Sequence, residues 1–228
     1  MLTKKYLAEV VSIKHPLEGV FTVEFAAVQS HFRYAPGQFL HLALDEYVAS
    51  MPWPDSRCFS IQSSPDEPNL RITYAVKGDF TRRMEAELAC GRTVWLKMPY
   101  GDLFSREHGK VGAVFVSGGT GITPYLSLFT SSVFAEYQDA KLFAGFRSKS
   151  YNVYHDELEH AKAINPTFSI TEIDEDTDGI LDVAGIVEGN RNSGGFFLSG
   201  PPAMLEAFKG QLAKSGIDAS MVHADDWQ

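Results

Sequence analysis

The hydrophobic pattern of the chain changes near residue 108, and this change constrains the fold more than any other feature. Before it, apolar and polar residues alternate in short runs bounded by Gly and Pro, such as VFTVEFAA and LRITYAVKG. About six runs of this kind predict an antiparallel barrel or sandwich whose strands bury one face. One helical segment, TRRMEAELACG, interrupts them, and we expect Thr81 to cap its start and Gly91 to end it.

After residue 108, nearly continuous apolar runs alternate with segments of helical period. KVGAVFVSGG is such a run and is typical of a strand covered on both faces. Alternating strands and helices predict a doubly wound parallel sheet. The later strands are expected at AKLFAGFR, FSITEI, GFFLSG and a short tail strand, and the helices at 124–136, 153–164, 182–190 and 202–216.

We therefore expect two domains, an antiparallel β-barrel over residues 1–105 and an α/β domain over residues 110–228. The polar segment FSREHGK, residues 104–110, is the expected linker. A chain of 228 residues buries roughly 70–75% of its unfolded surface. It is therefore large enough to fold without stabilising disulfides or metal ions.

Charge and composition exclude several classes of protein. The net charge of −9 argues against a nucleic-acid partner, because phosphates attract Lys and Arg. No apolar run approaches the ~18 residues of a membrane span, and the N-terminal segment lacks a signal-peptide pattern, so we expect a cytoplasmic protein. The two cysteines, Cys58 and Cys90, are far apart in the sequence, which favours reduced thiols, with a single disulfide as the alternative, and predicts no iron–sulfur or other metal centre.

The segment VFVSGGTGITPYLSLF, residues 114–129, combines a buried strand, a glycine-rich turn and a helix. The glycines allow positive φ and leave room for a ligand at the backbone, and Pro124 suits the first helical turn. Free N–H groups at the start of a helix form an anion site that a diphosphate would fit. A plain tight turn is the alternative on the glycines alone.

The stretch GFFLSGPPAM, residues 195–204, repeats this construction. A buried strand ends at Ser199, and the turn Gly200-Pro201-Pro202 leads into a helix. Turns that follow parallel strands lie along one edge of the sheet, where ligands bind. Two such turns favour an extended ligand along that edge, such as a dinucleotide.

Two motifs in the first domain indicate where a flat, anionic ligand would bind. Arg57 and Phe59 of RCFS share one face of a strand, and Ser60 lies on the other. GDFT places Thr81 at the start of a helix, whose free N–H groups suit a phosphate. An ordinary edge strand and a simple capped helix are the alternatives.

Taken together, these motifs resemble the ferredoxin–NADP reductase superfamily, which includes bacterial flavin reductases and cytochrome b reductases. RCFS is similar to the family's R-x-[YF]-[ST] motif, GDFT to its G-x-x-[ST] turn, and PYGDLF to its loop at the end of the barrel. GGTGITP and SGPPAM are similar to its nucleotide motifs, GGTGxxP and [CS]-G-P-x-x-M. The motifs occur in the family's order over nearly the whole chain.

The resemblance implies a six-stranded antiparallel Greek-key flavin barrel followed by a nicotinamide-nucleotide domain. Arg57 would pair with a flavin phosphate, Phe59 would pack on the isoalloxazine ring, and Ser60 would lie near flavin N5. Ser199 would hold the nicotinamide, so that Ser60 and Ser199 are the catalytic candidates. The implied cofactor is FAD, with FMN the less favoured choice. The other implied contacts are Cys58, Val76, Lys77, Gly78 and Thr81 for the flavin, and Gly119, Thr120, Gly121, Ile122, Pro124, Arg147, Gly200, Pro201 and Met204 for the nucleotide.

Two departures and the C-terminal tail qualify the resemblance. Phe59 stands where tyrosine is commoner, and Ser199 stands where many members have cysteine. Trp227 is a candidate to stack on the flavin, with packing on the sheet edge or fraying as the alternative. Asp225 and Asp226 are expected to be solvated acids of the tail, and a proton relay to the flavin is the alternative.

The expected co-substrate is NADH or NADPH, and the charges favour NADH. Arg147 and Lys149 follow the expected second strand of the α/β domain and suit a 2′-phosphate. After the third strand, EIDEDTD, residues 172–178, carries five acids and no base. Acidic groups there would repel the additional phosphate of NADPH.

Three functions are compatible with the sequence. The first is hydride transfer from NAD(P)H to bound FAD, with the electrons passed to a separate carrier protein or oxygenase. The second is a flavin reductase that releases free reduced flavin. The third is a flavin-binding electron-transfer subunit or regulator without turnover. The sequence does not identify the electron acceptor.

Overall fold

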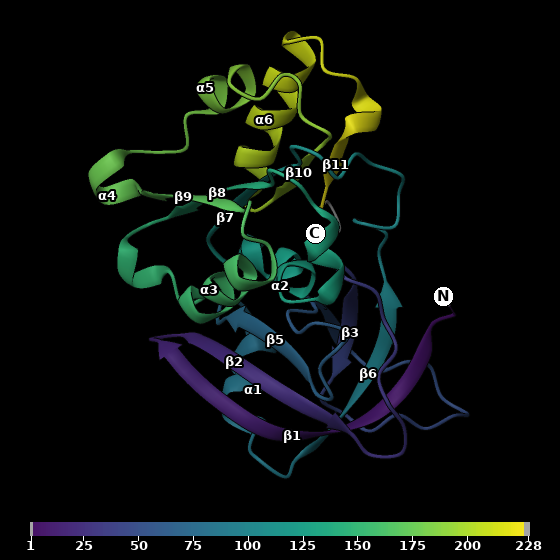
Figure 1. Cartoon of the computed structure of the whole chain (residues 1–228). Coiled ribbons are helices and arrows are strands. Elements are labelled where there is room, and N and C mark those ends of the chain that lie inside the picture. The colour runs from purple at the N-terminus through teal and green to yellow at the C-terminus, as the bar shows by residue number, and fades with distance from the viewer. Residues whose placement is uncertain (1, 226–228) are drawn as a thin grey trace. The chain divides into compact units, whose positions relative to one another are not determined.

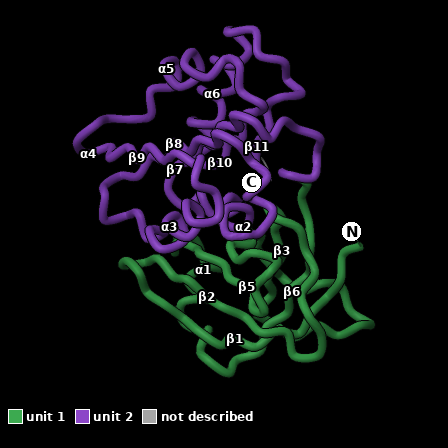
Figure 2. The backbone as a smooth tube through the Cα atoms, viewed as in Figure 1, with its two compact units in different colours: residues 1–102 green, residues 103–228 purple. Residues whose placement is uncertain are grey.

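The computed structural model describes residues 2–225, which form the strands and helices labelled in Figure 1. The chain divides into two compact units, residues 1–102 and 103–228, which Figure 2 shows in separate colours. The division falls just before the polar segment 104–110 that we expected to link the domains. Each unit is described by itself below.

Unit 1 contains a barrel-like antiparallel sheet of six strands within its described residues. The strand order is β4-β3-β6-β1-β2-β5, and every pairing is antiparallel. The predicted six-stranded antiparallel fold is therefore confirmed. The strands are β1 (Lys4–Leu17), β2 (Val20–Ala27), β3 (Phe39–Ala43), β4 (Ser56–Ser60), β5 (Leu70–Ala75) and β6 (Thr93–Tyr100).

The alternation of residues in the sequence decides which side of each strand faces the core. Phe21, Val23 and Phe25 of β2 are buried, and the residues between them are partly exposed. This period of two is what a sheet with one buried face requires. Leu40 and Leu42 of β3 bury the same face and pack in the same apolar core.

Helix α1 (Asp79–Glu87) differs from the prediction at both ends. Its N-cap is Gly78, and Thr81 is the third helical residue, so the expectation that Thr81 is the N-cap was wrong. The Thr81 hydroxyl instead accepts hydrogen bonds from the N–H groups of Lys77 (2.9 Å) and Gly78 (3.1 Å). The helix ends at Glu87 rather than at Gly91, whose positive φ of +87° lies in the turn that leads to β6.

Unit 2 contains a parallel sheet, and its described residues contribute five strands in the order β11-β10-β7-β8-β9. The strands are β7 (Val114–Gly118), β8 (Lys141–Phe146), β9 (Ser169–Asp174), β10 (Phe196–Ser199) and β11 (Val222–Ala224). The helices are α2 (Thr123–Phe129), α3 (His155–Ile164), α4 (Glu175–Asp178), α5 (Val183–Glu188) and α6 (Pro202–Lys214). Short 3-10 turns are η1 (Gly119–Ile122), η2 (Ser132–Glu136), η3 (Lys149–Tyr151) and η4 (Ala219–Met221).

Helices cover both faces of this sheet, as Figure 1 shows. Phe115 of β7 packs in a core with side chains of α2 and α3, whereas its neighbours Val114 and Val116 pack in a second core with α5 and α6. A strand that is buried on both faces reads as a continuous apolar run. The predicted doubly wound parallel sheet is therefore confirmed.

The helix predicted over residues 124–136 is interrupted. Helix α2 ends at Phe129, and the 3-10 turn η2 begins at Ser132. The hydroxyl of Thr130 donates to the carbonyl of Leu126, and that of Ser131 donates to the carbonyl of Leu128. Such local side-chain bonds compete with helix continuation, which explains the break.

Candidate functional site

The two glycine-containing turns of unit 2 touch each other at the carboxyl ends of β7 and β10. These strands are parallel neighbours, with Ser117 opposite Ser199. A Cβ atom built on Gly121 would lie 2.5 Å from the carbonyl oxygen of Ser199 and 2.7 Å from Cα of Gly200. A Cβ atom on Gly118 would lie 2.8 Å from Cδ of Pro201. The backbones can therefore meet only because both positions are glycine.

The GGTGITP turn presents its exposed backbone at one end and is anchored at the other. Gly119 is exposed, has a φ of +55°, and no heavy atom lies within 4 Å of where its Cβ would be. Ile122 and Pro124 are buried, and Pro124 lies in the first turn of α2. Thr120 is partly exposed, and its carbonyl accepts a bond from the hydroxyl of Thr123 (2.9 Å). Ligand contact is thus open to the first part of the turn, whereas Ile122 and Pro124 hold the turn in place.

Ser199 forms a buried hydrogen bond with a residue near the C-terminus. Its hydroxyl donates to Oδ2 of Asp225 over 3.3 Å, and the two residues are 3% and 9% exposed. The N–H of Asp225 donates to the carbonyl of Leu198, which fixes the position of the carboxylate. The expectation that Asp225 is a solvated acid was therefore wrong. Asp226 and Trp227 lie outside the described residues.

Sequence reasoning overlooked Ser117, which lies beside Ser199 on the same face of the sheet. Ser117 is fully buried, and its hydroxyl has no hydrogen-bond partner within residues 2–225. Nearby, burial and then the charge of Asp225 raise the pKa of Tyr125 well above its ordinary value, so this phenol stays protonated. Strands β7 and β10 end in the similar sequences FVSG and FLSG. This similarity is the sequence signal that could have identified Ser117.

In unit 1, the RCFS and GDFT motifs lie side by side. The guanidinium of Arg57 lies 5.2 Å from the ring centroid of Phe80, the second residue of α1. Arg57 is exposed and pairs with the equally exposed Asp55 (2.7 Å). Gly78, at the helix start, has no heavy atom within 4 Å of its Cβ position. The guanidinium of Arg57 and the accessible start of α1 are therefore close together.

The neighbours of Arg57 in β4 point to different sides. Phe59 is only 9% exposed and meets Tyr74 edge-on, with the ring centroids 5.9 Å apart. Cys58 points to the opposite face, where its Sγ lies 3.5 and 3.6 Å from the ring nitrogens of His41. Ser60 is half-buried. Cys58 is thus on the side of the strand away from Arg57, whereas Phe59 shares the face of Arg57.

The remaining predicted contacts are distributed over both units. In unit 1, Val76 is half-buried against the core and Lys77 is exposed. In unit 2, the sulfur of Met204 lies 3.1 Å from the Cβ position of Gly118, so Met204 packs under the paired turns. Arg147 is exposed just after β8, as predicted for a residue near the strand end.

The loop after β8 is joined to the acidic loop after β9. The carbonyl of Arg147 accepts a bond from the N–H of Asp176 (3.2 Å). The carboxylate of Asp174 accepts one from the N–H of Lys149 (3.1 Å). The two basic residues and the acids of 172–178 are therefore in the same region, and the acids outnumber the bases.

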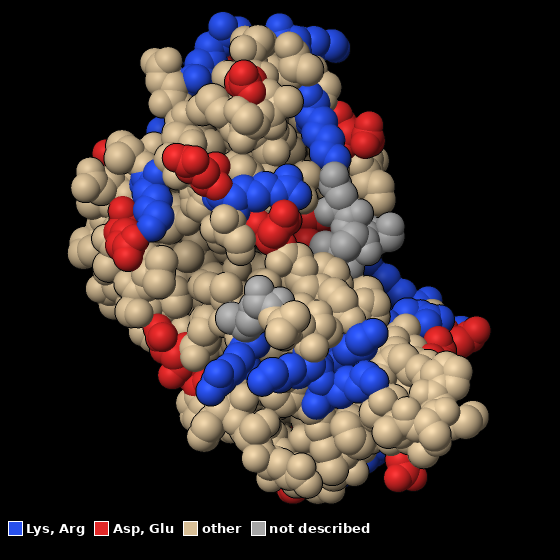
Figure 3. Space-filling model, turned by 90° about the vertical axis from the view of Figure 1, so that its right-hand side faces the viewer, with Lys and Arg blue, Asp and Glu red and all other residues tan. Residues whose placement is uncertain are grey.

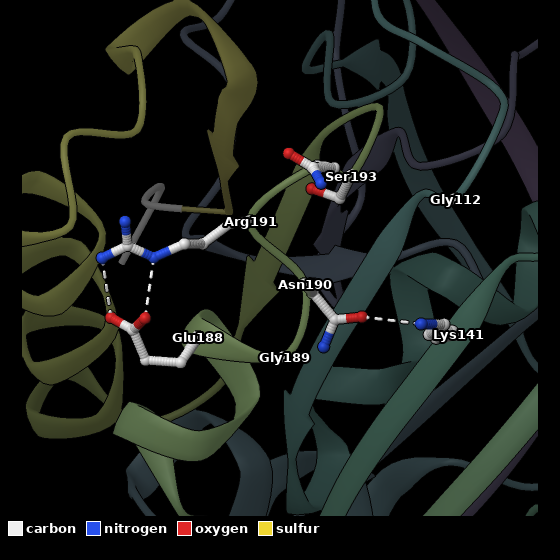
Figure 4. Close-up of a pocket in the computed structure, with 8 residues that line it drawn as sticks. Gly112, Lys141, Glu188, Gly189, Asn190, Arg191 and Ser193 are labelled. Carbon is white, nitrogen blue, oxygen red and sulfur yellow. Dashed lines mark hydrogen bonds and ion pairs between the residues drawn. The ribbon is translucent and has the colours of Figure 1, made fainter.

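A pocket of about 380 Å³ lies at the opposite, amino-terminal edge of the parallel sheet (Figure 4). Lys141, the first residue of β8, donates to Oδ1 of Asn190 (2.9 Å), and Arg191 pairs with Glu188 through two bonds of 2.7 and 2.9 Å. None of the predicted site residues lines this pocket, and its charged groups pair with protein partners.

Within residues 2–225, no three His, Cys, Asp or Glu side chains are grouped as metal ligands, and no helix is long and apolar enough to cross a membrane.

A family model matches part of the chain. The model described as the oxidoreductase NAD-binding domain matches residues 115–209, the segment that contains both glycine turns. Among curated proteins, the flavohemoprotein of Rhizobium meliloti is 22% identical over 83% of this chain and 52% of its own length. The reductase component of propane 2-monooxygenase from Mycolicibacterium goodii is 24% identical over 96% of this chain and 66% of its own length. The chain spans about half to two thirds of the length of these relatives.

Solved structures show the same two-domain fold. The cytochrome P450 reductase GcoB of Amycolatopsis superposes with a TM-score of 0.81 at 20% identity, covering 98% of this chain and 69% of that one. A ferredoxin NADP+ reductase from Neisseria gonorrhoeae, solved with bound FAD and NADP, superposes with a TM-score of 0.78 at 17% identity. In that case 98% of both chains is covered.

Proposed function

We propose that this chain is a member of the ferredoxin–NADP reductase superfamily, that it transfers a hydride from a nicotinamide nucleotide to bound FAD, and that it passes the electrons to a separate acceptor. The observation that carries the proposal is the contact between the turns after β7 and β10, which Gly118 and Gly121 make possible. Ligands of doubly wound sheets bind at the carboxyl ends of the strands. This contact forms a continuous backbone surface at that place.

The nucleotide would lie along this surface. Gly119 and Thr120 would offer backbone N–H groups to the diphosphate, because this part of the turn is open to solvent. Ser199 would meet the nicotinamide, with its hydroxyl oriented by the carboxylate of Asp225. A buried, pre-oriented hydroxyl fixes a ligand with little entropic cost.

The residues of unit 1 fit the phosphate end of FAD. The Arg57 guanidinium and the start of α1 lie together, and Arg57 is exposed. Its partner Asp55 is equally exposed, so the pair is weak, and a phosphate would bind the guanidinium through two charge-assisted bonds. The exposed backbone at Gly78 and the hydroxyl of Thr81, which orders the helix start, complete this site.

When bound, FAD would accept a hydride and release electrons singly. The task of the chain is then to hold the two reacting ring systems and to exclude water. Phe59 and Ser60 would support the flavin ring from β4, and Ser199 would hold the nicotinamide. No side chain is required to act as a general base for hydride transfer, and all these roles are binding and positioning roles.

Two further parts of the proposal concern the co-substrate and the acceptor. We favour NADH, because the loop after β9 places Asp176 and its acidic neighbours beside Arg147.

We also favour a separate protein acceptor, and the names of relatives support this. They include reductase components of propane 2-monooxygenase and phenol 2-monooxygenase.

Anaerobic stopped-flow reduction of the FAD-loaded protein, with NADH and NADPH in parallel, tests the proposal. We expect the flavin absorbance to bleach with both nucleotides and faster with NADH. Faster reduction by NADPH would contradict the NADH preference alone. No reduction by either nucleotide, or no FAD uptake by the purified protein, would contradict the proposed function.

A further inference from the structure

The pocket at the amino-terminal edge of the parallel sheet has no part in the proposed function. It is lined by Gly112, Lys141 and residues 188–193, and its volume is about 380 Å³ (Figure 4). This volume lies in the lower part of the range of small-molecule sites, roughly 300–1,000 Å³. The nucleotide of a doubly wound sheet binds at the opposite, carboxyl edge. A ligand in this pocket would therefore occupy a second site in unit 2.

The backbone beside the pocket is closely packed. The N–H of Gly109 donates to the carbonyl of Gly194 (3.0 Å), and a Cβ atom on Gly194 would lie 2.5 Å from the carbonyl oxygen of Val111. The N–H of Ser193 donates to the carbonyl of Asn190 (3.0 Å). The segments before β7 and β10 are thus fixed against each other, and the pocket between them is preformed. A preformed site loses little entropy when a ligand binds.

Ser193 places an unused hydrogen-bonding group at this pocket. The residue lines the pocket and is 8% exposed, and its Oγ has no hydrogen-bond partner within residues 2–225. A buried hydroxyl without a partner lowers the stability of the folded state. Such a group in a folded protein indicates a partner that is supplied from outside the chain.

Lys141 supplies a positive charge without an acidic partner. Its amine donates to Oδ1 of Asn190 (2.9 Å), and Nδ2 of the same amide donates to the carbonyl of Ile186 (2.7 Å), which fixes the orientation of the amide. Within residues 2–225, no Asp or Glu forms an ion pair with Lys141. The amine therefore keeps N–H groups and an uncompensated charge for a ligand.

Other cations of unit 2 are compensated by acids. Lys110 and Lys162 each pair with a glutamate, and Figure 3 shows several neighbouring basic and acidic side chains on one face of the molecule. Arg191, which also lines the pocket, pairs with Glu188, and Oε1 of Glu188 accepts a further bond from Ser215 (3.1 Å). The only acid among the lining residues is thus already bonded. Because both side chains of its ion pair are half-exposed, this pair is weak, and Arg191 stays available to a ligand.

We propose that this pocket binds the phosphate group of a small molecule. The inference does not depend on the proposed function. Phosphate oxygens would accept hydrogen bonds from the amine of Lys141 and the hydroxyl of Ser193, which lie around the same space in Figure 4. Lysine binds phosphate as a point charge, and a phosphate has more acceptor oxygens than a carboxylate for the unused donors. Exposed acids elsewhere in unit 2 oppose the anion only weakly, because salt screens charges beyond about 8 Å.

The test titrates the FAD-loaded protein with inorganic phosphate and follows its backbone amides by NMR, with chloride at equal ionic strength as the control for salt. We expect saturable shifts at Gly112, Gly189 and Ser193, with a dissociation constant of about 1 mM. K141M should weaken phosphate binding by roughly tenfold or more, because it removes a charge-assisted hydrogen bond. K162M makes the same change in charge at an exposed lysine of α3 and should stay within about twofold of the wild type.

S193A separates the loss of the ligand contact from a loss of stability. Without phosphate, S193A should be at least as resistant to urea as the wild type, because it removes a buried hydroxyl that has no partner. It should nevertheless bind phosphate about threefold or more weakly. Succinate, a dicarboxylate, should bind to the wild type more weakly than phosphate does.

Several outcomes would overturn the inference. One is phosphate binding by K141M or S193A that equals binding by the wild type. Another is the absence of a saturable shift at the pocket amides below about 10 mM phosphate. Shifts confined to the glycine turn after β7 would assign the phosphate to the nucleotide edge instead. Tighter binding of succinate than of phosphate would contradict the class of ligand.

Discussion

Gly121 and the carbonyl of Ser199 are so close that a Cβ atom on Gly121 would lie 2.5 Å from that oxygen. The contact joins the turn after β7 to the turn after β10, and it leaves no space for any side chain. Both residues belong to motifs that the sequence places about 80 positions apart. The shape of the proposed nucleotide surface therefore depends on the absence of a single methyl group.

Replacing Gly121 with alanine should separate the two turns. We expect G121A to lower the free energy of unfolding by about 1–3 kcal/mol, as overpacking typically does, and to raise the KM for NADH. Urea unfolding and steady-state kinetics would measure the two effects. The control is G210A, an exposed helical site with no neighbouring atom within 4 Å, which should gain about 0.5–1 kcal/mol. Unchanged stability and KM in G121A would contradict the steric account.

Removing the Ser199 hydroxyl should slow hydride transfer more than it weakens flavin binding. S199A loses the bond to Asp225 and the proposed contact with the nicotinamide. Stopped-flow reduction should slow by roughly tenfold, a typical cost of one lost positioning hydrogen bond, while the FAD dissociation constant stays within about twofold. S117A, which removes the adjacent hydroxyl, is the comparison. Equal flavin reduction rates in S199A and the wild type would contradict the proposed contact between Ser199 and the nicotinamide.

The Thr81 hydroxyl should stabilise the start of α1 although Thr81 is not the N-cap. It accepts hydrogen bonds from the backbone N–H groups of Lys77 and Gly78. At the start of a helix, such N–H groups lack a partner within the helix. T81A should lower the free energy of unfolding by about 0.5–2 kcal/mol, the range found for capping residues. T81S keeps the hydroxyl and should behave as the wild type. Identical denaturant curves for the two variants would argue against this role.

His41 should make unit 1 less stable at acidic pH. Burial first, and then the charge of Lys97, lowers the pKa of His41 below its ordinary value of 6.5. The folded state therefore favours the neutral ring. The stabilisation is complete above the unfolded-state pKa of 6.5 and is lost as the pH falls through the lower folded-state pKa.

An NMR titration of the His41 ring protons measures this pKa directly. K97M removes the neighbouring charge, so the pKa should rise in this variant but remain lowered by burial. The fall in unfolding free energy between about pH 7.5 and pH 5 should be smaller in H41Q than in the wild type. A wild-type His41 that titrates above 6.5 would contradict the prediction.

Local patterns in the sequence were sufficient to predict both sheets. The alternation in β2 and the continuous apolar run of β7 each reflect how many faces of a strand are buried. The placement of both glycine turns at one edge of the parallel sheet also followed from the rule that parallel strands present their turns along one edge, whereas the contact between them did not. In each of these cases, the pattern that allows the prediction lies within a single segment of the sequence.

Features that depend on pairing between distant segments could not be predicted in this way. The burial of Asp225 follows from the pairing of β11 with β10, which the short tail strand does not reveal. The alignment of Lys97 with His41 across neighbouring strands needs the registers of β3 and β6. The break after α2 has a different, local cause, because the hydroxyls of Thr130 and Ser131 donate to carbonyls of the helix.

The position of β9 has a consequence for how copies of the protein behave at high concentration. β9 is the last strand in the order of the parallel sheet, and an unpaired edge can recruit a strand from another molecule. Glu172 of β9 is exposed and is held by the amide of Asn152 (2.8 Å), and Asp176 and Asp178 follow directly in α4. A second strand would have to align with these carboxylates. The acids that we propose to favour NADH should thus also disfavour self-association through this edge.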